Sequence, residues 1–362
     1  MRGTRLELRS EALRHNARVA RQLSGDAAVY AMVKANGYGH GLVFVARSLV
    51  KDVDGFGVAL LDEARTLREA GISAPIMLLE GVFDADELVA AAALGCELIV
   101  HSEWQVELLE SASLSVPVGV WLKLNTGMYR LGVPLTELDK LVLRLQQCHS
   151  ASFVGMASHF ACADMSDDLM SASQLDQVRD AAARHAVPFS AANSAAIFRY
   201  PHSAGVRVRP GIMLYGSSPF TDRSAKSLGL QVTQRLSARI IALNSVPAGE
   251  AVGYGSSWQA QRDSTVAVVA IGYGDGYPRH APSGTPLAVK NSDSIWRAAT
   301  LAGRVSMDMI TIDVTDLPLT RVGDEVELWG DHVSVDEVAQ RCGTISYELF
   351  CRLTERPERV FF

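Results

Sequence analysis

The sequence lacks the cysteine patterns that mark disulfide frameworks and structural zinc sites. Its five cysteines are odd in number, and no C-x-x-C pair occurs among them. Disulfide-rich domains and zinc sites both need paired, closely spaced cysteines, so neither is expected here. We therefore predict free thiols, which suit a cytoplasmic location, and no metal site.

Long apolar runs and long basic runs are missing as well. The stretch at 88–100 is interrupted by Glu97 and is too short to span a bilayer, and residues 1–16 carry charges throughout instead of a signal-peptide core. The net charge is −6, and the lysines and arginines are scattered. This pattern predicts a soluble protein and gives no electrostatic reason to expect a nucleic-acid or membrane partner.

What is present is a regular alternation of β-rich and amphipathic helical runs between residues 28 and 216. The chain of 362 residues is long enough for two domains, and this alternation fills the first. An open doubly wound sheet is less favoured, because no G-x-G-x-x-G follows the first strand. Repeated strand–helix units predict an α/β fold of the (β/α)8, or TIM, barrel type. The expected strands cover 29–34, 55–60, 76–79, 98–100, 118–125, 153–159, 189–192 and 206–209, with helices between them at 62–70, 84–94, 102–111, 136–147 and 167–185.

The pattern changes after about residue 230. Strand-like runs are now separated by Gly, Pro and Asp turns, which predicts a second, mostly-β domain. The polar segment 217–229 is the expected linker, so the predicted domains are 1–230 and 231–362. Residues 4–8 are also strand-like, and we expect the segment 1–10 to be able to pair with the C-terminal domain. The expected C-terminal strands cover 239–243, 265–271, 286–289, 310–314 and 325–328.

One lysine lies where a barrel enzyme places its chemistry. Lys34 follows the first barrel strand in AMVKANGYGHG, where Gly-rich sequence with Tyr38 and His40 begins. The C-terminal rim of the strands carries the active site in enzymes of this fold. A lysine at a strand end is usually just solvated, but a desolvated lysine among cations can act as a Schiff-base nucleophile. The flanking residues favour a reactive amine here.

The last two predicted barrel strands are followed by segments that suit a phosphate group. They are AANSAA at 191–196 and VRVRPGIMLYG at 206–216. Barrel phosphate sites commonly use these two loops, with backbone N–H groups at the start of a short helix. Asn193 and Ser194 can cap such a helix, and Gly211 and Ile212 offer N–H groups. An imine-forming lysine together with a phosphate site predicts pyridoxal 5'-phosphate (PLP).

An ordered series of motifs resembles the alanine racemase family. The resemblance implies a PLP-binding (β/α)8 barrel followed by a β domain, an amino-acid substrate, and a homodimer whose active sites are shared between subunits. It also implies interconversion of L-alanine and D-alanine, which supplies D-alanine for cell-wall peptidoglycan. The motifs span residues 33–351 and are, in order, VKANGYGHG, LKLNTGMYRLG, SHFACAD, ANSAA, VRPGIMLYG, VGYG, IGYGDGYPR, GRVSMD and SYELFC.

The resemblance also assigns a catalytic pair and the residues around the cofactor. Lys34 matches the lysine that binds PLP and acts as base toward the D-enantiomer. Tyr254 matches the base toward the L-enantiomer, which the family places in the partner subunit's site. Arg209 matches the arginine that faces the pyridine nitrogen, and His159 matches its hydrogen-bonded supporter. The implied phosphate contacts are Tyr38, Ser194, Gly211, Ile212 and Tyr347.

Further matches concern the substrate. Arg130 and Met307 match the groups that hold the substrate carboxylate, with Met307 again coming from the partner. Lys123 matches a lysine that is often carbamylated and that orients Arg130. The residues that match the lining of the substrate channel are Tyr273, Arg279, Arg304 and Ile345. Two bases on opposite faces of Cα allow a proton to be removed on one side and returned on the other.

The arginine at the ring nitrogen bears on the choice of reaction. Arginine has a pKa above about 12 and keeps its proton, so the ring nitrogen stays largely unprotonated and the cofactor is a weaker electron sink. This favours racemisation over transamination. It also argues against a barrel-type PLP decarboxylase, in which an acidic residue occupies this position. The sequence departs from the family at Asn125, where aspartate is usual, and at 356–359, where RPER replaces RVPR.

Other functions remain open at this point. Racemases of serine or of broad specificity share the scaffold, and the pocket volume that separates them is not readable from one sequence. Outside the enzymes, the alternative is a PLP-binding carrier without turnover. Such carriers are single-domain barrels, so the C-terminal domain with Tyr254 and Met307 favours the enzyme.

Overall fold

The computed structural model describes residues 3–362, which divide into two compact units. One unit consists of residues 13–231. The other joins the described N-terminal residues up to 12 with residues 232–362. The chain therefore crosses between the units at 231–232, beside the boundary expected from the sequence, and at 12–13, inside helix α1 (Ser10–Ser24).

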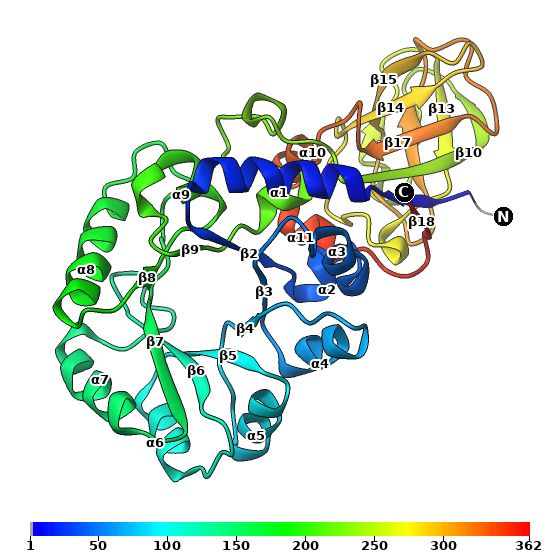
Figure 1. The fold of residues 1–362 in the computed structure, drawn as a ribbon. Coiled ribbons are helices and arrows are strands. Elements are labelled where there is room, and N and C mark those ends of the chain that lie inside the picture. The colour runs from blue at the N-terminus through cyan, green and yellow to red at the C-terminus, as the bar shows by residue number, and fades with distance from the viewer. Residues whose placement is uncertain (1–2) are drawn as a thin grey trace. The chain divides into compact units, whose positions relative to one another are not determined.

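Parallel strands form a closed barrel in the first unit (Figure 1). Their order is β8-β7-β6-β5-β4-β3-β2-β9, so that neighbours in sequence are neighbours in the sheet. The ends meet between β8 and β9, where the Val206 N–H donates to Phe189 O at 3.0 Å and the Arg209 N–H to Ala192 O at 2.9 Å. The predicted (β/α)8 barrel is confirmed. Its strands are β2 (Ala28–Met32), β3 (Gly55–Val58), β4 (Ile76–Leu78), β5 (Cys96–Val100), β6 (Val118–Lys123), β7 (Ala151–Ala157), β8 (Phe189–Ser190) and β9 (Arg207–Val208).

Helices alternate with these strands and cover the outside of the barrel (Figure 1). Each buries one face: α7 buries Leu138, Leu141 and Leu145, at the three- and four-residue spacing of an amphipathic helix. Helix α8 begins at Ser171 instead of 167, because the Asp168 carboxylate accepts the N–H groups of Met170 and Ser171 at 2.8 and 3.0 Å. The other elements of this unit are α2 (Lys34–Tyr38), α3 (Leu42–Leu49), α4 (Leu61–Glu69), α5 (Ala85–Ala93), α6 (Glu103–Ser111), α7 (Leu138–Gln147), α8 (Ser171–Arg184), α9 (Ser194–Arg199), η1 (Leu135–Glu137), η2 (Pro201–Ser203), η3 (Ile212–Tyr215) and η4 (Lys226–Leu228).

Glycines inside the barrel strands make room for large neighbours. A Cβ on Gly55 would lie 2.6 Å from the ring of Tyr30, with which Gly55 is paired across β2 and β3. A Cβ on Gly155 would lie 3.0 Å from the ring of Trp121. Because real Cβ contacts are longer than this, these positions require glycine. These glycines therefore leave the space that the buried rings of Tyr30 and Trp121 occupy.

The second unit is a mostly-β domain, as predicted. Its larger sheet has the order β13-β16-β15-β14-β17-β10-β1-β18, and β13 also pairs with β10. The N-terminal strand β1 runs antiparallel to β10 and parallel to β18, so both ends of the described chain lie in this sheet. The sequence analysis did not identify β15, β18, α10 or α11. The strands are β1 (Arg5–Leu8), β10 (Gln234–Val246), β13 (Ser264–Val269), β14 (Pro286–Lys290), β15 (Trp296–Leu301), β16 (Ile310–Asp313), β17 (Glu325–Trp329) and β18 (Glu358–Phe361), with the hairpin β11 (Ala251–Val252) and β12 (Trp258–Gln259), and helices α10 (Val335–Arg341), α11 (Ser346–Cys351), η5 (Tyr254–Ser256) and η6 (Tyr273–Asp275).

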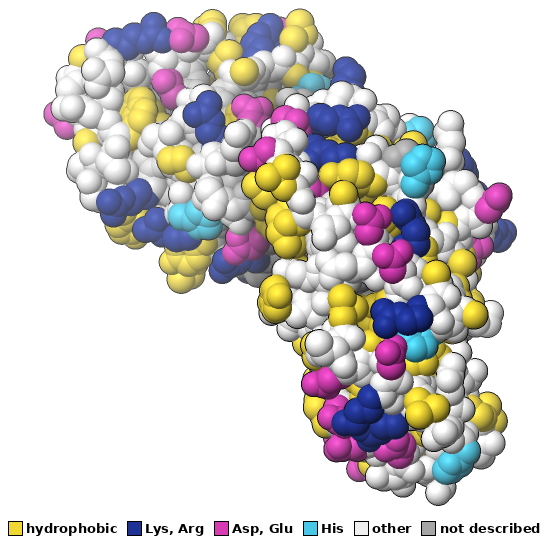
Figure 2. All heavy atoms as spheres, turned by 90° about the vertical axis from the view of Figure 1, so that its left-hand side faces the viewer, with side chains coloured by type: hydrophobic (Ala, Val, Ile, Leu, Met, Phe, Trp, Pro, Cys, Tyr) yellow, Lys and Arg dark blue, Asp and Glu magenta, His cyan; other side chains and the backbone are white. Residues whose placement is uncertain are grey.

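The surface mixes charges of both signs. On the face drawn in Figure 2, basic and acidic side chains are interspersed, with small groups of hydrophobic side chains between them. No helix within residues 3–362 combines the length and the apolar character that crossing a membrane requires.

Candidate active site

Several of the predicted site residues lie at the carboxyl ends of the barrel strands. Lys34 follows β2, Lys123 ends β6, His159 follows β7 and Arg209 follows β9. Because all strands of the barrel are parallel, these positions share one end of it, which we call the barrel mouth. Their charges act on one another, since Lys34, Arg130 and Arg209 all lower the pKa of Lys123.

Lys34 begins a left-handed turn of the backbone. Residues 35–38 have φ angles between 50 and 60°, although only Gly37 among them is a glycine. Left-handed backbone costs roughly 1–2 kcal/mol for each residue with a Cβ, so other contacts must hold the turn. The Glu63 carboxylate accepts the Ala35 N–H at 2.7 Å, and the Asn36 side chain accepts the Leu42 N–H at 2.8 Å. The sequence analysis missed Glu63, because nothing local links it to the lysine.

The turn presents the ring of Tyr38 to the loop after β9. This ring stacks on Tyr215 with centroids 4.5 Å apart, and the Tyr215 hydroxyl donates to Met32 O at 2.8 Å. The Tyr38 hydroxyl lies so close to the backbone of residue 211 that a Cβ there would approach it to 2.6 Å. Gly211 is therefore required by the close approach of this hydroxyl.

Polar groups from the loops after β8 and β9 meet at Ser194. Its hydroxyl accepts the Gly211 N–H at 2.9 Å and the Met213 N–H at 3.4 Å. The neighbouring Asn193 side chain caps α9 by accepting the Ala196 N–H at 3.0 Å. Ser194 and Ile212 are buried. Because its oxygen accepts these N–H groups, the Ser194 hydroxyl is oriented and can donate its own proton to a phosphate group.

Arg209 is buried, with 7% of its surface exposed. Its guanidinium donates to the Ser190 hydroxyl, to Ser158 O and, at 3.4 Å, to Ala191 O. The resemblance predicts a hydrogen bond with His159, but the described acceptors of Arg209 are these fixed oxygens at the ends of β7 and β8. Burial lowers the pKa of Arg209 to about 10, which still leaves it protonated at neutral pH.

Lys123 and His159 both lose basicity in the mouth. Burial, then the charges of Arg209, Arg130 and Lys34, lower the pKa of Lys123 to about 8, against the opposing charge of Glu80. Burial, then the charge of Arg209, lowers the pKa of His159 well below its usual value, so its imidazole is neutral at pH 7.

Two further residues at the strand ends belong to this neighbourhood and were not identified from the sequence. Glu80 follows β4, and its negative charge raises the pKa of Lys123. His101 follows β5, and burial and the charge of Lys123 lower its pKa. The signal that could have found them is their position at the carboxyl ends of consecutive strands.

Arg130 lies in the loop after β6 and is exposed. The loop begins at Asn125, whose side-chain oxygen accepts the N–H groups of Gly127 and Tyr129 at 3.2 and 3.0 Å. Asparagine therefore provides the acceptor oxygen that shapes this turn without placing a negative charge beside Arg130.

The remaining predicted residues lie in the C-terminal unit. Tyr254 belongs to η5 and is 69% exposed, and Met307 is 53% exposed. Arg304 packs over Gly255, where a Cβ would lie 3.1 Å from its guanidinium. The others are Tyr273, Arg279 and Ile345, which are exposed, and Tyr347 in α11, which is partly buried. Each unit thus carries its own set of candidate residues.

Known proteins resemble this chain over both of its units. The family described as "Alanine racemase, N-terminal domain" matches residues 8–219, and "Alanine racemase, C-terminal domain" matches residues 233–361. An alanine racemase of Alcanivorax borkumensis is 60% identical over 360 residues, which cover 99% of each chain. The crystal structure of the biosynthetic alanine racemase from Pseudomonas aeruginosa matches with a TM-score of 0.95 at 43% identity, over 100% of both chains. The alanine racemase structure from Acinetobacter baumannii matches with a TM-score of 0.93 at 41% identity, again over 100% of both chains.

Proposed function

The chain belongs to the alanine racemase family, and we propose that it interconverts L-alanine and D-alanine with PLP as its cofactor. Its product D-alanine would supply cell-wall peptidoglycan. The observation that carries the proposal is the barrel mouth, where Lys34, the hydrogen-bonded pair of Ser194 and Gly211, and the buried Arg209 share one end of one barrel.

The residues of the barrel mouth fit PLP at separate points. The Lys34 amine has no hydrogen-bond partner within residues 3–362 and is available for covalent attachment. The Ser194 hydroxyl and the Ile212 N–H suit its phosphate, and the Gly211 N–H orients that hydroxyl by donating to its oxygen at 2.9 Å. The missing Cβ of Gly211 leaves room beside Tyr38. When bound, PLP supplies an electron-withdrawing ring that stabilises negative charge at the substrate Cα.

Arg209 is suited to the pyridine nitrogen. It remains protonated at neutral pH, since its pKa of about 10 lies well above 7, and it donates hydrogen bonds without giving up a proton. The ring nitrogen would then stay largely unprotonated, which limits side reactions that need a stronger electron sink. Arginine in this role favours racemisation.

The cations of the mouth suit an anionic substrate. The charges of Lys34, Arg130 and Arg209 all lower the pKa of Lys123. His159 adds no charge, because burial and these cations hold its pKa well below its usual value. Such a field attracts the cofactor phosphate and the amino-acid carboxylate. We assign the carboxylate to exposed Arg130 and to Met307 of the partner subunit.

Two bases are needed to invert Cα. We assign the proton on one face to the Lys34 amine and the proton on the other to the hydroxyl of Tyr254 of the partner subunit. Tyr254 is 69% exposed and Met307 is 53% exposed, as expected of side chains that a second copy covers. The working form would therefore be a homodimer with shared active sites.

The first experiment compares wild-type protein with Lys34→Ala, using the exposed Lys51→Ala as a matched control. We expect wild type and Lys51→Ala to show the visible absorption of lysine-bound PLP and to abolish the optical rotation of L-alanine, and Lys34→Ala to lose both. Absorption without any racemisation would favour a PLP carrier. Faster loss of rotation with L-serine would favour a serine or broad-specificity racemase, and no absorption would reject PLP.

Mixing two inactive variants tests the shared site. A dimer of Lys34→Ala with Tyr254→Phe has one site that lacks both bases and one site that is intact. Random exchange of subunits should therefore restore about a quarter of the wild-type activity. No restored activity in a mixture that forms mixed dimers would reject the shared arrangement.

We further propose a cytoplasmic location, because the cysteines are free thiols that suit a reducing compartment.

A further inference from the structure

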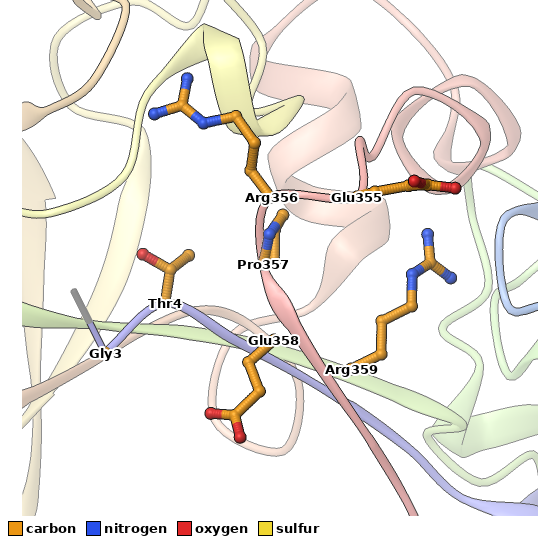
Figure 3. Close-up of a pocket in the computed structure, with 7 residues that line it drawn as sticks. All are labelled: Gly3, Thr4, Glu355, Arg356, Pro357, Glu358 and Arg359. Carbon is orange, nitrogen blue, oxygen red and sulfur yellow. The ribbon is translucent and has the colours of Figure 1, made fainter. Parts of the chain in front are cut away.

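Loops from three parts of the C-terminal unit meet at one arginine. Arg356 follows α11, and its Nε lies 3.2 Å from an Asp275 carboxylate oxygen, while its Nη2 donates to Asp308 at 2.7 Å. Asp275 is fully buried in the η6 turn of Tyr273, and Asp308 directly follows Met307. In Figure 3, Arg356 extends from the C-terminal segment toward the yellow ribbon, whereas Arg359 lies on the other side beside Glu355. One guanidinium thus joins the two loops.

The backbones of these loops are also in direct contact. The Tyr273 N–H donates to Ser306 O at 3.0 Å, and the Gly274 N–H donates to Met307 O at 2.9 Å. The approach is close enough that a Cβ on Gly272 would lie 2.3 Å from Ser306 O. A change in either loop therefore moves the backbone of Met307.

Arg356 also packs against the backbone of Gly274, in the loop of Tyr273. A Cβ on Gly274 would lie 2.1 Å from its Nη1, so glycine at 274 leaves the space that the guanidinium fills. The Thr354 hydroxyl donates to Gly274 O at 3.0 Å, and its N–H donates to Asp275 O at 3.2 Å. The hydrogen bond to Asp308, followed by the charges of Asp275 and Asp308, raises the pKa of Arg356. Charge and geometry both favour the two-carboxylate contact.

We propose that Arg356 is a positioning residue for substrate binding, which holds the loops of Met307 and Tyr273 in the arrangement that the active site uses. The inference rests on the proposed function, which gives Met307 the substrate carboxylate. Arg356 acts through Asp308 and Asp275 and touches no reacting group. A planar guanidinium can bridge two carboxylates at fixed angles, whereas the ammonium of a lysine is a single point charge. The RPER sequence, which departs from the family at its second and third positions, retains this arginine.

The test uses the PLP-loaded dimer and the variants Arg356→Gln and Arg356→Lys. The matched control is Arg352→Gln, which removes an exposed ion pair with Glu348 (2.7 Å) from the same segment. We expect Arg356→Gln to raise KM for both alanine enantiomers about tenfold with kcat changed less than about threefold, as when an interaction that holds bound substrate is lost. Arg356→Lys should recover only part of this, and Arg352→Gln should behave as wild type.

A second set of variants tests whether Arg356 acts through Asp308. Asp308→Asn should raise KM in the same way, and the double variant should be no worse than Arg356→Gln alone, because both substitutions break one contact. A wild-type KM in Arg356→Gln, whatever its Tm, would overturn the positioning role, as would full recovery by lysine. If the glutamine variant does not fold, an unchanged KM in Arg356→Lys overturns it equally. Absence of racemase activity in the wild type would instead reject the proposed function.

Discussion

Two arginines close together at β9 differ in their partners. Arg207 and Arg209 are two residues apart at β9, so their side chains leave the same face of the strand. Arg207 lies between the rings of Tyr30 and Trp121, 4.4 and 4.6 Å from their centroids, and it pairs with the carboxylate of Glu97. Among residues 3–362, the acceptors of Arg209 are all neutral oxygens.

The difference predicts that Arg207 stabilises the fold and that Arg209 serves a bound ligand. Beside Arg207, the Trp121 ring N–H also donates to Glu97 at 3.0 Å. The Glu97 carboxylate is therefore held by both a guanidinium and a ring N–H. At the mouth, the charges of Arg209, Arg130 and Lys34 lower the pKa of Lys123, and the charge of Glu80 opposes them. An excess of one charge in a partly buried site weakens the fold and is retained where an anion binds.

The strongest test replaces Arg209 by methionine. Removing a guanidinium from the cofactor site should lower kcat/KM about 100- to 1000-fold, the usual effect of losing one such donor. The free energy of unfolding should stay within about 1 kcal/mol, because an uncompensated buried charge is replaced by an apolar side chain of similar length. Steady-state kinetics and urea denaturation measure both. An Arg209→Met enzyme of near wild-type activity would contradict the assignment.

Replacing Arg207 by methionine should instead destabilise the fold and leave the activity of the folded protein nearly unchanged. Arg207→Met leaves Glu97 without its charged partner, and breaking a fully buried pair costs about 3–5 kcal/mol. Because both side chains are partly exposed, we expect a loss nearer to about 2 kcal/mol in urea denaturation. The folded fraction should keep kcat/KM within about twofold. A loss of activity as large as that of Arg209→Met would show that the two arginines are not separate in function.

Lys123→Met extends the comparison to a pH dependence. The pKa of Lys123 is about 8 in the folded protein and near 10.4 in an unfolded chain. The protonated amine therefore weakens the fold at and below pH 8, and this effect fades as the pH rises toward 10.4. We expect the apo variant to have a higher Tm than apo wild type at pH 7 and a similar Tm above pH 10.5. An equal Tm difference at both pH values would contradict it.

The smallest expected effect concerns His159. Burial and the charge of Arg209 hold its pKa well below the usual value, so nitrogen-15 NMR of labelled histidine should find a neutral ring from pH 6 to 8. In Arg209→Met, the ring loses one neighbouring cation and its pKa should rise, whereas Arg207→Met should leave it unchanged. Titration of His159 in the wild type above pH 6 would contradict the burial that the fold imposes.

Sequence patterns were sufficient for the architecture because they are local. The strand–helix alternation up to residue 216 and the Gly-, Pro- and Asp-bounded strands beyond 230 each reflect nearby residues, and the barrel and mostly-β domain follow from them. The sequence analysis missed β18, which has four residues, and β15, which pairs with β14 and β16 in the sheet. The predicted start of α8 was too early, because the Asp168 side chain accepts the N–H groups of Met170 and Ser171 and forms a turn there.

The candidate site divides in the same way. Lys34 and the segments of Ser194 and Gly211 stand out in the sequence, since strand ends and Gly-rich turns are recognisable locally. Glu63, which holds the left-handed turn at Lys34, and Arg356, which joins Asp275 to Asp308, do not stand out. Each acts on residues 28 or more positions away, and only the folded chain brings such pairs together.

The amino-acid sequence by itself determined the kind of fold, the family and the positions at which chemistry is expected, because periodicity and ordered motifs are properties of the chain. The tertiary structure alone decided which charges are paired. Arg207 and Arg209 are the same residue type on one strand, and nothing in VRVRPG distinguishes a neutralised arginine from an available one. Glu97 reaches Arg207 across the closed barrel, while neutral oxygens surround Arg209, and that difference exists only in three dimensions.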